Sequence, residues 1–525
     1  MLPFSPHHFG AIDWSVVAVY ASVILSIGFF YSRGQKTTEE YFTAQGQVSP
    51  FMAGISLCAS LFSTISYIAV PGEMIQNGPI FAVMYSVALP FTYLAVGWVM
   101  IPAIMRRRVT SAYELLQARL GLSSRLLGSV IFVLTRLVVM SLILYTSSRI
   151  IVDIMGWPKA WGFYLAAGCG GVTMIYTLFG GIRAVVLTDV IQFFVLFSGA
   201  VVTLICITLA LGGVAGWWPR HWFKHWAAQP PVSWDPHVRV TMLGTFLGAL
   251  IWWVCTAGSD QMTIQRYLTT RDARSARRAF LMNNVADVCS TALLSLVGLA
   301  LIGFFQAHPE ALRPGTTMTR NGDSLFPVYI SQFLPVGVTG LVVSGLLAGS
   351  MSSVSSGINS LIAVVSKDWL ETFWPAAGGT EKHKMHTAHI LAVVIGFIIV
   401  GGSRLIGLVP GNLLEVTFKT CGLFLCPMFG LFFLALFVPF STPFGAIFSA
   451  LYSLSAAFIV GYWDLLTGGA GLSFQWIAPV ALVVSLSTGV LLSLLPTRGR
   501  SRKVQALFAL GAVLPLVAVF AWVRR

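Results

Sequence analysis

Long apolar stretches follow one another along almost the whole chain, separated by short polar segments. A helix that crosses a membrane needs roughly 20 mostly apolar residues, and about fourteen stretches of this sequence reach that length. The pattern predicts an all-α polytopic membrane protein. The expected spans lie near residues 11–31, 51–73, 80–105, 126–152, 160–179, 188–212, 241–257, 279–305, 331–361, 386–406, 411–438, 442–464, 474–495 and 505–522.

Three segments at membrane depth, 51–74, 255–266 and 344–360, carry polar residues where a simple span would be apolar. The second passes from apolar to polar through Gly258, and the third reads SGLLAGSMSSVSSGINS. Interrupted or hydroxyl-rich helices occur at membrane depth only where they are buried or line a cavity. We therefore expect these segments to line an ion or solute site. In the first segment the polar residues are Ser56, Ser60, Ser63, Thr64 and Ser66, and Pro71-Gly72 is expected to end the helix.

The order of the irregular helices predicts an internal repeat. The segment 51–74 opens one block of five spans, and 241–266 opens the next five. Secondary transporters with inverted repeats place interrupted helices at corresponding positions of the two halves. The predicted divisions are an extra N-terminal helix and cytoplasmic loop (1–50), a first five-helix repeat (51–212), an extracellular loop (213–240), a second five-helix repeat (241–438) and extra C-terminal helices (439–525).

Composition and charge exclude a soluble or nucleic-acid-binding protein. The chain is 56% hydrophobic and 10% charged, whereas soluble domains are about 25% charged. Its formal charge of +14 comes from 32 Lys and Arg against 18 Asp and Glu. Most of these basic residues, including Arg266, fall in loops that become cytoplasmic when the N-terminus is placed outside, as the positive-inside rule requires. Both termini are then outside the cell. The expected partner of this surface is the lipid bilayer and not a nucleic acid.

Five ionisable residues lie within or close to spans, namely Arg136, Arg149, Asp189, Glu415 and Lys419. Each costs about 2.5–3.5 kcal/mol at the bilayer centre unless it is paired or hydrated. Glu415 and Lys419 are four residues apart on one helix and are expected to neutralise each other. Arg149 is near the end of its span, where its side chain can reach the interface.

Arg136 and Asp189 each leave two interpretations open. Arg136 lies deep in its span without an acid within one helical turn. Because a guanidinium binds a carboxylate through two parallel hydrogen bonds, its partner is either an acid of the protein or the carboxylate of a solute. Asp189 either caps the N-terminus of a helix, a role that Thr188 also fits, or binds a cation.

The serine-rich segment 344–360 also leaves two interpretations open. Gly345, Gly349, Ser353 and Gly357 repeat every four residues, a pattern typical of close helix packing. Gly349, Ser352, Ser353 and Ser356 share one helical face, and Ser352, Ser355, Ser356 and Asn359 share the adjoining face. Packing explains the small residues but not the hydroxyl groups. Hydroxyl and carbonyl oxygens are ligands for a hard monovalent cation.

Three motifs resemble those of the sodium/solute symporter family. They are GGIRAVVLTDVIQ at 180–192, DQMTIQRYL at 260–268 and SSVSSGINS at 352–360, and the resemblance extends in order over roughly residues 10–500. It implies a leucine-transporter-type five-plus-five inverted repeat with fourteen helices, and alternating access driven by a sodium gradient. It also implies that sodium is the only metal ion involved and that the protein is not an enzyme.

The resemblance implies two sodium sites and a substrate site at particular residues. The general sodium site falls on the carbonyls of Ala59, Phe62 and Gly349 and the hydroxyls of Ser352 and Ser353. A second sodium site, present in some members, falls on Asp189, Ser352, Ser355 and Ser356. The chain is therefore expected to bind two sodium ions.

For the substrate, the residues are most similar to those of bacterial sialic acid symporters, which place an arginine at the position of Arg136. Ser63, Ser66 and Phe81 also fit that site. The sequence departs from it at Leu61, where a polar residue is expected, and at Tyr85, where a glutamine is expected. An organic anion is therefore better supported than sialic acid itself. In the sugar-transporting branch the second broken helix carries amide and aromatic residues, and Asp260 and Met262 here count against a neutral hexose.

The sequence thus predicts a sodium-coupled symporter in a bacterial inner membrane that imports a carboxylate-bearing solute, with sialic acid as the first candidate. The substrate-binding residues are expected to be Ser63, Ser66, Phe81, Tyr85 and Arg136, in a protein that functions as a monomer. A monocarboxylate, a sugar or another small solute is the alternative within the family. A channel or sensor on the same scaffold is the alternative of another class. An intramembrane enzyme lacks support because no HExxH or GxSxG motif is present.

Overall fold

The computed structural model describes residues 9–32, 38–107, 109–312, 317–319, 322–374, 380–405, 413–497 and 502–523. These residues form helices and connecting loops, with no strand among them. The chain ends, for which an outside location is predicted, lie outside the described residues. The helices are α1 (Ala11–Ser32), α2 (Thr38–Thr43), α3 (Pro50–Leu61), α4 (Thr64–Asn77), α5 (Ile80–Ala95), α6 (Ile101–Met105), α7 (Glu114–Met155), α8 (Trp161–Ala210), α9 (Met242–Ser259), α10 (Gln261–Leu268), α11 (Ala273–Ala307), α12 (Gly322–Gln332), α13 (Val338–Val364), α14 (Glu371–Phe373), α15 (Glu381–Ser403), α16 (Leu413–Phe437), α17 (Pro443–Gly461), α18 (Trp463–Thr467), α19 (Ile477–Ser493) and α20 (Arg502–Val523).

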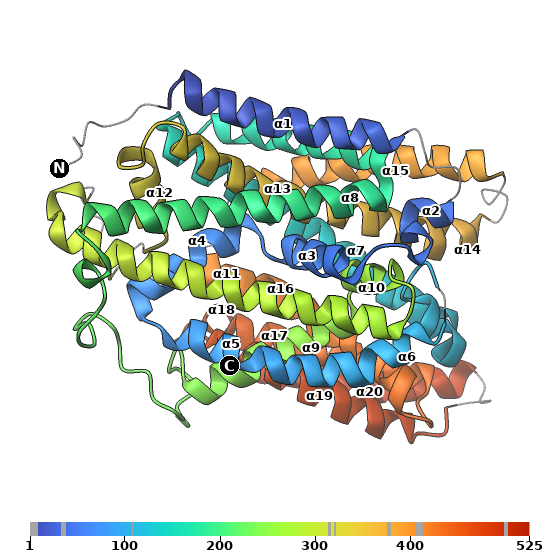
Figure 1. Ribbon diagram of the computed structural model, residues 1–525. Helices are drawn as coiled ribbons and strands as arrows, with labels where there is room; N and C mark the ends of the chain where they lie inside the picture. The colour runs from blue at the N-terminus through green and yellow to red at the C-terminus, as the bar shows by residue number, and fades with distance from the viewer. Residues whose placement is uncertain are drawn as a thin grey trace.

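The long helices run side by side in one bundle (Figure 1). Among the described residues, 11 helices are long and apolar enough to cross a membrane, or up to 12 when the bent pair α3/α4 is one span. The predicted count of about fourteen is not confirmed. Two predicted spans, 160–179 and 188–212, are joined in α8 through Gly181, whose φ of 53° interrupts the helix. A third, 505–522, forms α20, whose apolar stretch Leu507–Val519 is shorter than a full span.

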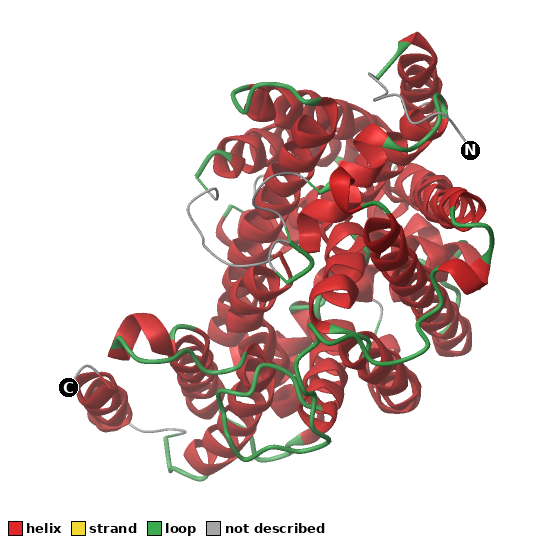
Figure 2. Cartoon of the chain, turned by 90° about the vertical axis from the view of Figure 1, so that its left-hand side faces the viewer, coloured by secondary structure: helices red, strands yellow, loops and turns green. Residues whose placement is uncertain are grey.

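The serine-rich helix α13 lies at the centre of the bundle. In its most apolar stretch 89% of the residues are buried, whereas in that of the peripheral helix α1 22% are buried. It packs against α8, α1, α7 and α3. Viewed nearly along the helix axes, α1 and α20 lie on opposite sides of the bundle (Figure 2). The polar residues of α13 are therefore shielded from lipid, as a hydroxyl-rich helix requires.

The first irregular helix breaks at Phe62, between α3 and α4, and the two halves are bent by 68°. Phe62 has extended backbone angles, and the Ser63 side chain accepts a hydrogen bond from the backbone N–H of Ile65 at the start of α4. The expectation that the helix ends at Pro71-Gly72 is wrong, because α4 continues to Asn77 with Pro71 inside it. Neighbouring groups can satisfy the backbone that a proline frees inside a packed membrane helix.

The second broken helix consists of α9 and α10, which meet at Asp260. The Asp260 side chain accepts a hydrogen bond from Met262 N–H at 2.9 Å and so caps α10. Residues from Gln261 to Tyr267 are all buried. The assignment of Arg266 to a cytoplasmic loop is therefore wrong, because this polar segment folds back into the bundle as a short helix.

The interpretation of Asp189 as a helix N-cap is also wrong. Asp189 lies inside α8, and the break in that helix is at Gly181, several residues earlier. The Thr188 hydroxyl donates to the carbonyl of Val185 in the same helix, at 3.0 Å. Asp189 is fully buried and needs partners from other helices.

Candidate functional site

The two breaks leave helix ends in the middle of the bundle. The C-terminal ends of α3 and α9 have carbonyl groups without a partner within the helix, and the N-terminal ends of α4 and α10 have N–H groups in the same situation. A helix N-terminus carries a partial positive charge and favours anions, whereas free carbonyls favour cations. The paired breaks therefore create an environment for both an anion and a cation.

A cavity of about 200 Å³ lies beside the breaks. Its lining includes all five residues predicted to bind substrate: Ser63, Ser66, Phe81, Tyr85 and Arg136. Aromatic rings gather on the same wall, because Phe81 stacks on Tyr85 with centroids 6.1 Å apart and packs edge-on against Phe418 at 6.1 Å. The structure thus brings together side chains from α4, α5, α7 and α16.

Arg136 forms a buried ion pair with Asp260, the capping residue of α10. The contact joins Nη2 of the arginine to Oδ2 of the aspartate, while Oδ1 caps α10. Of the two partners that the sequence left open, an acid of the protein is therefore present. Arg136 Nε is buried without a hydrogen-bond partner among the described residues, so the guanidinium retains a donor for a further anion.

Asp287, on α11, is a cavity residue that the sequence analysis missed. Its Oδ2 accepts a hydrogen bond from the Tyr85 hydroxyl at 2.9 Å. An acid inside the predicted span 279–305 is the same kind of signal that drew attention to Asp189, so the residue could have been found. The site is more acidic than the sequence analysis expected.

Three of the five groups predicted to bind the first sodium lie in one cluster. The Ser352 hydroxyl is 2.8 Å from the Ala59 carbonyl and 3.3 Å from the Gly349 carbonyl. The Ser353 hydroxyl is buried without a hydrogen-bond partner among the described residues, and Phe62 is at the adjoining break. The cluster therefore joins the end of α3 to α13 through oxygen atoms.

Gly349 makes this close approach possible. A Cβ atom at this position would lie 3.1 Å from the backbone N of Thr64 and 2.7 Å from Leu196. A side chain here would push α13 away from the break. The glycine that the pattern marked as a packing residue therefore also positions the carbonyl.

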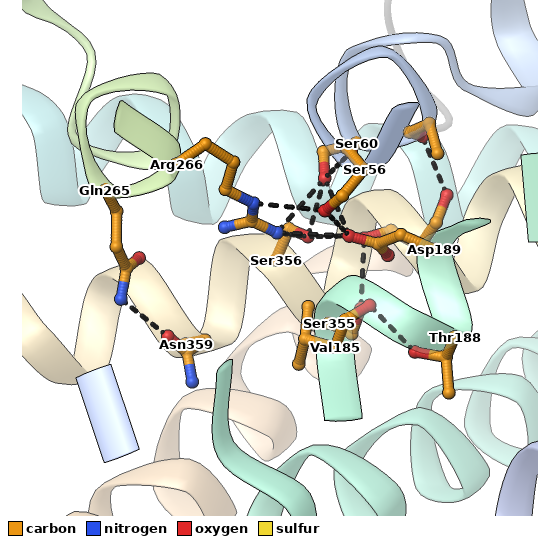
Figure 3. A network of polar contacts seen from close by, with 12 residues as sticks. Ser56, Ser60, Val185, Thr188, Asp189, Gln265, Arg266, Ser355, Ser356 and Asn359 are labelled. Atoms are coloured by element: carbon orange, nitrogen blue, oxygen red, sulfur yellow. Dashed lines mark hydrogen bonds and ion pairs between the residues drawn. The ribbon is translucent and has the colours of Figure 1, made fainter. Parts of the chain in front are cut away.

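A second cluster surrounds Asp189, where α3, α8, α10 and α13 meet (Figure 3). Oδ2 of Asp189 accepts hydrogen bonds from Ser56 at 2.6 Å, Ser60 at 3.2 Å and Ser356 at 3.3 Å. The Arg266 guanidinium lies 3.1 Å from the same oxygen and also contacts the Ser356 hydroxyl. Oδ1 has no partner among the described residues.

The predicted second sodium site is only partly assembled in this conformation. Of the three serines expected beside Asp189, Ser356 contacts it. The Ser355 hydroxyl instead donates to the Ser352 carbonyl at 3.0 Å, and the Ser352 hydroxyl belongs to the first cluster. Ser56, Ser60 and Arg266 are contacts that the sequence analysis did not assign to this site.

Beside the cavity, whose lining includes Glu73, Arg239 joins three segments. Its guanidinium binds both carboxylate oxygens of Glu73 on α4, at 2.6 and 2.9 Å, and Glu415 on α16 at 2.9 Å. The expected pairing of Glu415 with Lys419 is wrong, because Lys419 instead lies 4.0 Å from the carboxylate of Asp464. The loop before α9 supplies a better partner than the neighbouring turn of the helix, because a guanidinium can bind two carboxylates at once.

The chain is similar in sequence to sodium-coupled symporters over most of its length. The model of the sodium:solute symporter family matches residues 41–452. The sodium/sialic acid symporter NanT of Aliivibrio fischeri is 28% identical over 436 residues, which cover 82% of this chain and 84% of NanT. SiaT of Proteus mirabilis, also a sodium/sialic acid symporter, is 29% identical and covers 87% of this chain and 90% of its own.

A solved structure has the same fold over most of the chain. It is the substrate-bound outward-open state of a Na⁺-coupled sialic acid symporter, with a TM-score of 0.78 and 25% identity. The match covers 92% of this chain and 98% of the other. The predicted leucine-transporter-type architecture is thereby confirmed, as is the expectation of a transporter rather than an enzyme.

Proposed function

We propose a solute and an ion-binding scheme for this chain, which belongs to the sodium:solute symporter family and is a multi-pass, sodium-coupled symporter. The symporters named above supply the first compound to test, because each is described as a sodium-coupled sialic acid symporter.

The solute that we propose is an organic compound with a carboxylate group, and sialic acid is the first candidate. The observation that carries this proposal is the Arg136 guanidinium on the cavity wall, whose Nε has no hydrogen-bond partner in the described part of the chain. The N-terminal ends of α4 and α10 add partial positive charge at the same level. The carboxylate binds Arg136, while Ser63, Ser66, Phe81 and Tyr85 contact the rest of the solute. A monocarboxylate or a sugar is the alternative.

The first sodium ion binds between α3 and α13. Its ligands are the carbonyls of Ala59, Phe62 and Gly349 and the hydroxyls of Ser352 and Ser353. Support comes from the contacts of Ser352 with two of these carbonyls, and from the buried hydroxyl of Ser353, which none of the described residues contacts through a hydrogen bond. Hydroxyl and carbonyl oxygens suit a hard monovalent cation.

The second sodium ion binds at Asp189 and competes with Arg266. Both cations need Oδ2 of Asp189 and the Ser356 hydroxyl, which the guanidinium contacts in this conformation. Two positive charges cannot share these two oxygens closely without strong repulsion. Sodium binding therefore requires the Arg266 side chain to move away from Asp189. The hydroxyls of Ser352, Ser355 and Ser356 then coordinate the ion together with Asp189. Ser56 and Ser60 are additional candidate ligands.

Sodium and solute favour the same conformation. Sodium between α3 and α13 holds the first broken helix in place and favours the outward-open state, in which the solute reaches the cavity. The Arg239 contacts with Glu73 and Glu415 then close the external side, and inward opening releases sodium and solute. Because coupling is reciprocal, each ligand raises the affinity of the other by the same factor.

In the cell, we place the chain in a bacterial inner membrane with both termini outside, functioning as a monomer in the lipid bilayer. The two repeats are assigned to 51–212 and 241–438, with the extra helices at 1–50 and 439–525. The asymmetry of Lys and Arg between the two sets of loops supports the orientation. The orientation is tested with the variant Ser233→Cys, in the loop before α9, which a membrane-impermeant maleimide should label from outside the cell.

Counterflow in proteoliposomes tests the transport proposal. Vesicles preloaded with N-acetylneuraminic acid should accumulate labelled compound in sodium medium and not in choline medium. The matched variants Ser352→Ala and Ser344→Ala lie on the same helix, but the Ser344 hydroxyl donates to the Gly340 carbonyl of that helix. Only Ser352→Ala should weaken sodium activation. Equal uptake with and without sodium would refute the scheme, and flux that never saturates would favour a channel.

A further inference from the structure

Asp287 is a buried acid of the substrate cavity that takes part in none of the ion pairs among the described residues. It lies in the middle of α11 and is 3% exposed. The Tyr85 hydroxyl donates to Oδ2, and Oδ1 has no hydrogen-bond partner among the described residues. One carboxylate oxygen of a cavity residue is therefore available to a ligand.

The other charged groups that line this cavity already have partners. Arg136 is paired with Asp260, and Glu73 is paired with Arg239. Asp287 is the remaining acid in the lining. A buried carboxylate without a counter-ion is costly, and it is stabilised by a cation or by several strong donors. A solute that brings only a second carboxylate would increase the negative charge of the cavity.

Aromatic rings surround the same position. Tyr85 stacks on Phe81 and contacts Trp253 edge-on, with centroids 6.0 Å apart. Trp253 lines the cavity, and its Nε1 is buried without a hydrogen-bond partner among the described residues. An acid beside aromatic faces is an environment suited to a cationic group, because the faces are electron-rich.

We propose that Asp287 and Tyr85 form a subsite for an ammonium group of the transported solute. The solute is then a small zwitterion, whose carboxylate binds Arg136 and whose ammonium group binds Oδ1 of Asp287. This inference rests on the proposed transport of a carboxylate-bearing solute and narrows its chemistry. It also gives a physical role to Tyr85, one of the two positions, with Leu61, at which the sequence departs from the pattern of sialic acid symporters. The cavity of about 200 Å³ suits a small solute, because pockets that bind drug-sized ligands have volumes of roughly 300–1,000 Å³.

The test uses carboxylic acids in pairs that differ by one ammonium group. The pairs are 4-aminobutyrate with butyrate, 6-aminohexanoate with hexanoate, and the methyl glycosides of neuraminic and N-acetylneuraminic acids. Butylamine is included as an amine without a carboxylate. Binding to the full-length purified protein is measured by thermal shift in sodium and in choline, and Kd is determined for every compound that stabilises it.

The expected result is that at least one amino acid binds in sodium at least tenfold more tightly than its partner without the ammonium group. In Asp287→Asn this preference is lost, whereas the exposed loop variant Asp235→Asn keeps it. Tyr85→Phe retains part of it, because the carboxylate remains. The preference of the wild-type protein is informative even if Asp287→Asn does not fold.

The opposite results separate this inference from the proposed function. If carboxylates bind in sodium without any preference for the ammonium member, the inference is overturned and the proposed function stands. If butylamine binds in a way that depends on Asp287 and no carboxylate binds, the ammonium subsite exists. The same result refutes the proposal that the solute carries a carboxylate. If no ammonium compound stabilises the protein, or if Asp287→Asn keeps the full preference, the subsite does not exist.

Discussion

Two buried arginine–aspartate pairs lie at the two ends of α10, and their surroundings differ. Asp260 at the start of the helix binds Arg136, and Arg266 near its end binds Asp189. The first pair lines the cavity and is surrounded by aromatic rings and helix ends. The second pair is outside the cavity lining and is surrounded by the hydroxyls of Ser56, Ser60 and Ser356.

The difference in surroundings suits the two arginine–aspartate pairs to ligands of opposite charge. A guanidinium beside a cavity offers unused donors to an anion, whereas a carboxylate among hydroxyls offers oxygens to a cation. In the proposed scheme the first pair stays intact and offers the remaining donor of Arg136 to the solute, whereas in the second pair sodium replaces Arg266. Because both pairs involve α10, a movement of this short helix would affect solute and sodium together.

The largest expected effect is on stability, in Arg266→Gln. Removing one partner of a buried ion pair costs about 3–5 kcal/mol, so the melting temperature should fall strongly in choline. Sodium can replace the guanidinium at Asp189 and should restore a large part of the loss. Thermal unfolding followed by tryptophan fluorescence in the two salts measures this difference.

Two other variants make that experiment specific. Arg136→Gln should also destabilise the protein, but without recovery in sodium. Arg271→Gln removes an exposed arginine, and surface pairs contribute only about 0–1 kcal/mol, so little change is expected. Equal recovery of Arg266→Gln and Arg136→Gln in sodium would remove the distinction between the two pairs.

The next largest effect is on solute binding, in Arg136→Gln. A hydrogen bond to a charged group contributes about 1.5–3 kcal/mol, which corresponds to a loss of roughly 10- to 100-fold in affinity for a carboxylate. Neutral analogues such as the methyl ester should lose much less. Scintillation proximity binding in sodium measures both, with Arg149→Gln on the same helix as the control. Equal losses for acid and ester would assign Arg136 to a purely structural pair.

A smaller and more selective effect on the sodium dependence of binding is expected for Asp189→Asn, whose stability falls as in Arg266→Gln because the same buried pair is broken. It removes the carboxylate of the second sodium site and leaves the cluster around Ala59 and Ser352 intact. Sodium should therefore still activate binding, but with a lower Hill coefficient. Titration of solute binding with sodium at constant ionic strength gives this value. An unchanged coefficient would mean that Asp189 serves only Arg266.

The smallest expected effect is for Ser353→Ala, which removes one neutral ligand from the first sodium site. A neutral hydrogen-bonding group contributes about 0.5–1.5 kcal/mol, so the sodium concentration for half-maximal activation should rise roughly two- to tenfold. The melting temperature in choline should stay close to that of the wild type, because the hydroxyl has no protein partner among the described residues. A large loss of stability in choline would contradict its assignment to sodium.

Much of the site could be predicted from local patterns. Hydroxyl groups in an apolar segment marked α3, α4 and α13, and Arg136 stood out because no acid lies within one turn of it. The change in polarity after Gly258 located the second break to within two residues of Asp260. These signals are readable because the cost of a polar group in hydrocarbon is high at any single position.

The errors at the site itself concern contacts between distant segments. Arg266 was assigned to a loop because the polar residues of α10 look like the end of a span, and their burial depends on neighbouring helices. Glu415 was paired with Lys419 on its own helix, although Arg239 approaches from a loop 176 residues earlier in the chain. Asp287 carries a local signal, an acid inside a predicted span, but its contact with Tyr85, 202 residues away, is visible only in the structure.

The sequence by itself determined that this is a helical membrane protein, where its helices are interrupted and that Arg136 and Asp189 carry charge at membrane depth. These properties follow from the free energy of placing each segment in hydrocarbon, which depends on local composition. Only the tertiary structure decided which charges neutralise one another. Arg136 and Asp260 are separated by 124 residues, and Asp189 and Arg266 by 77. Such pairs form because desolvated charges must find partners, and packing alone determines which partners are within reach.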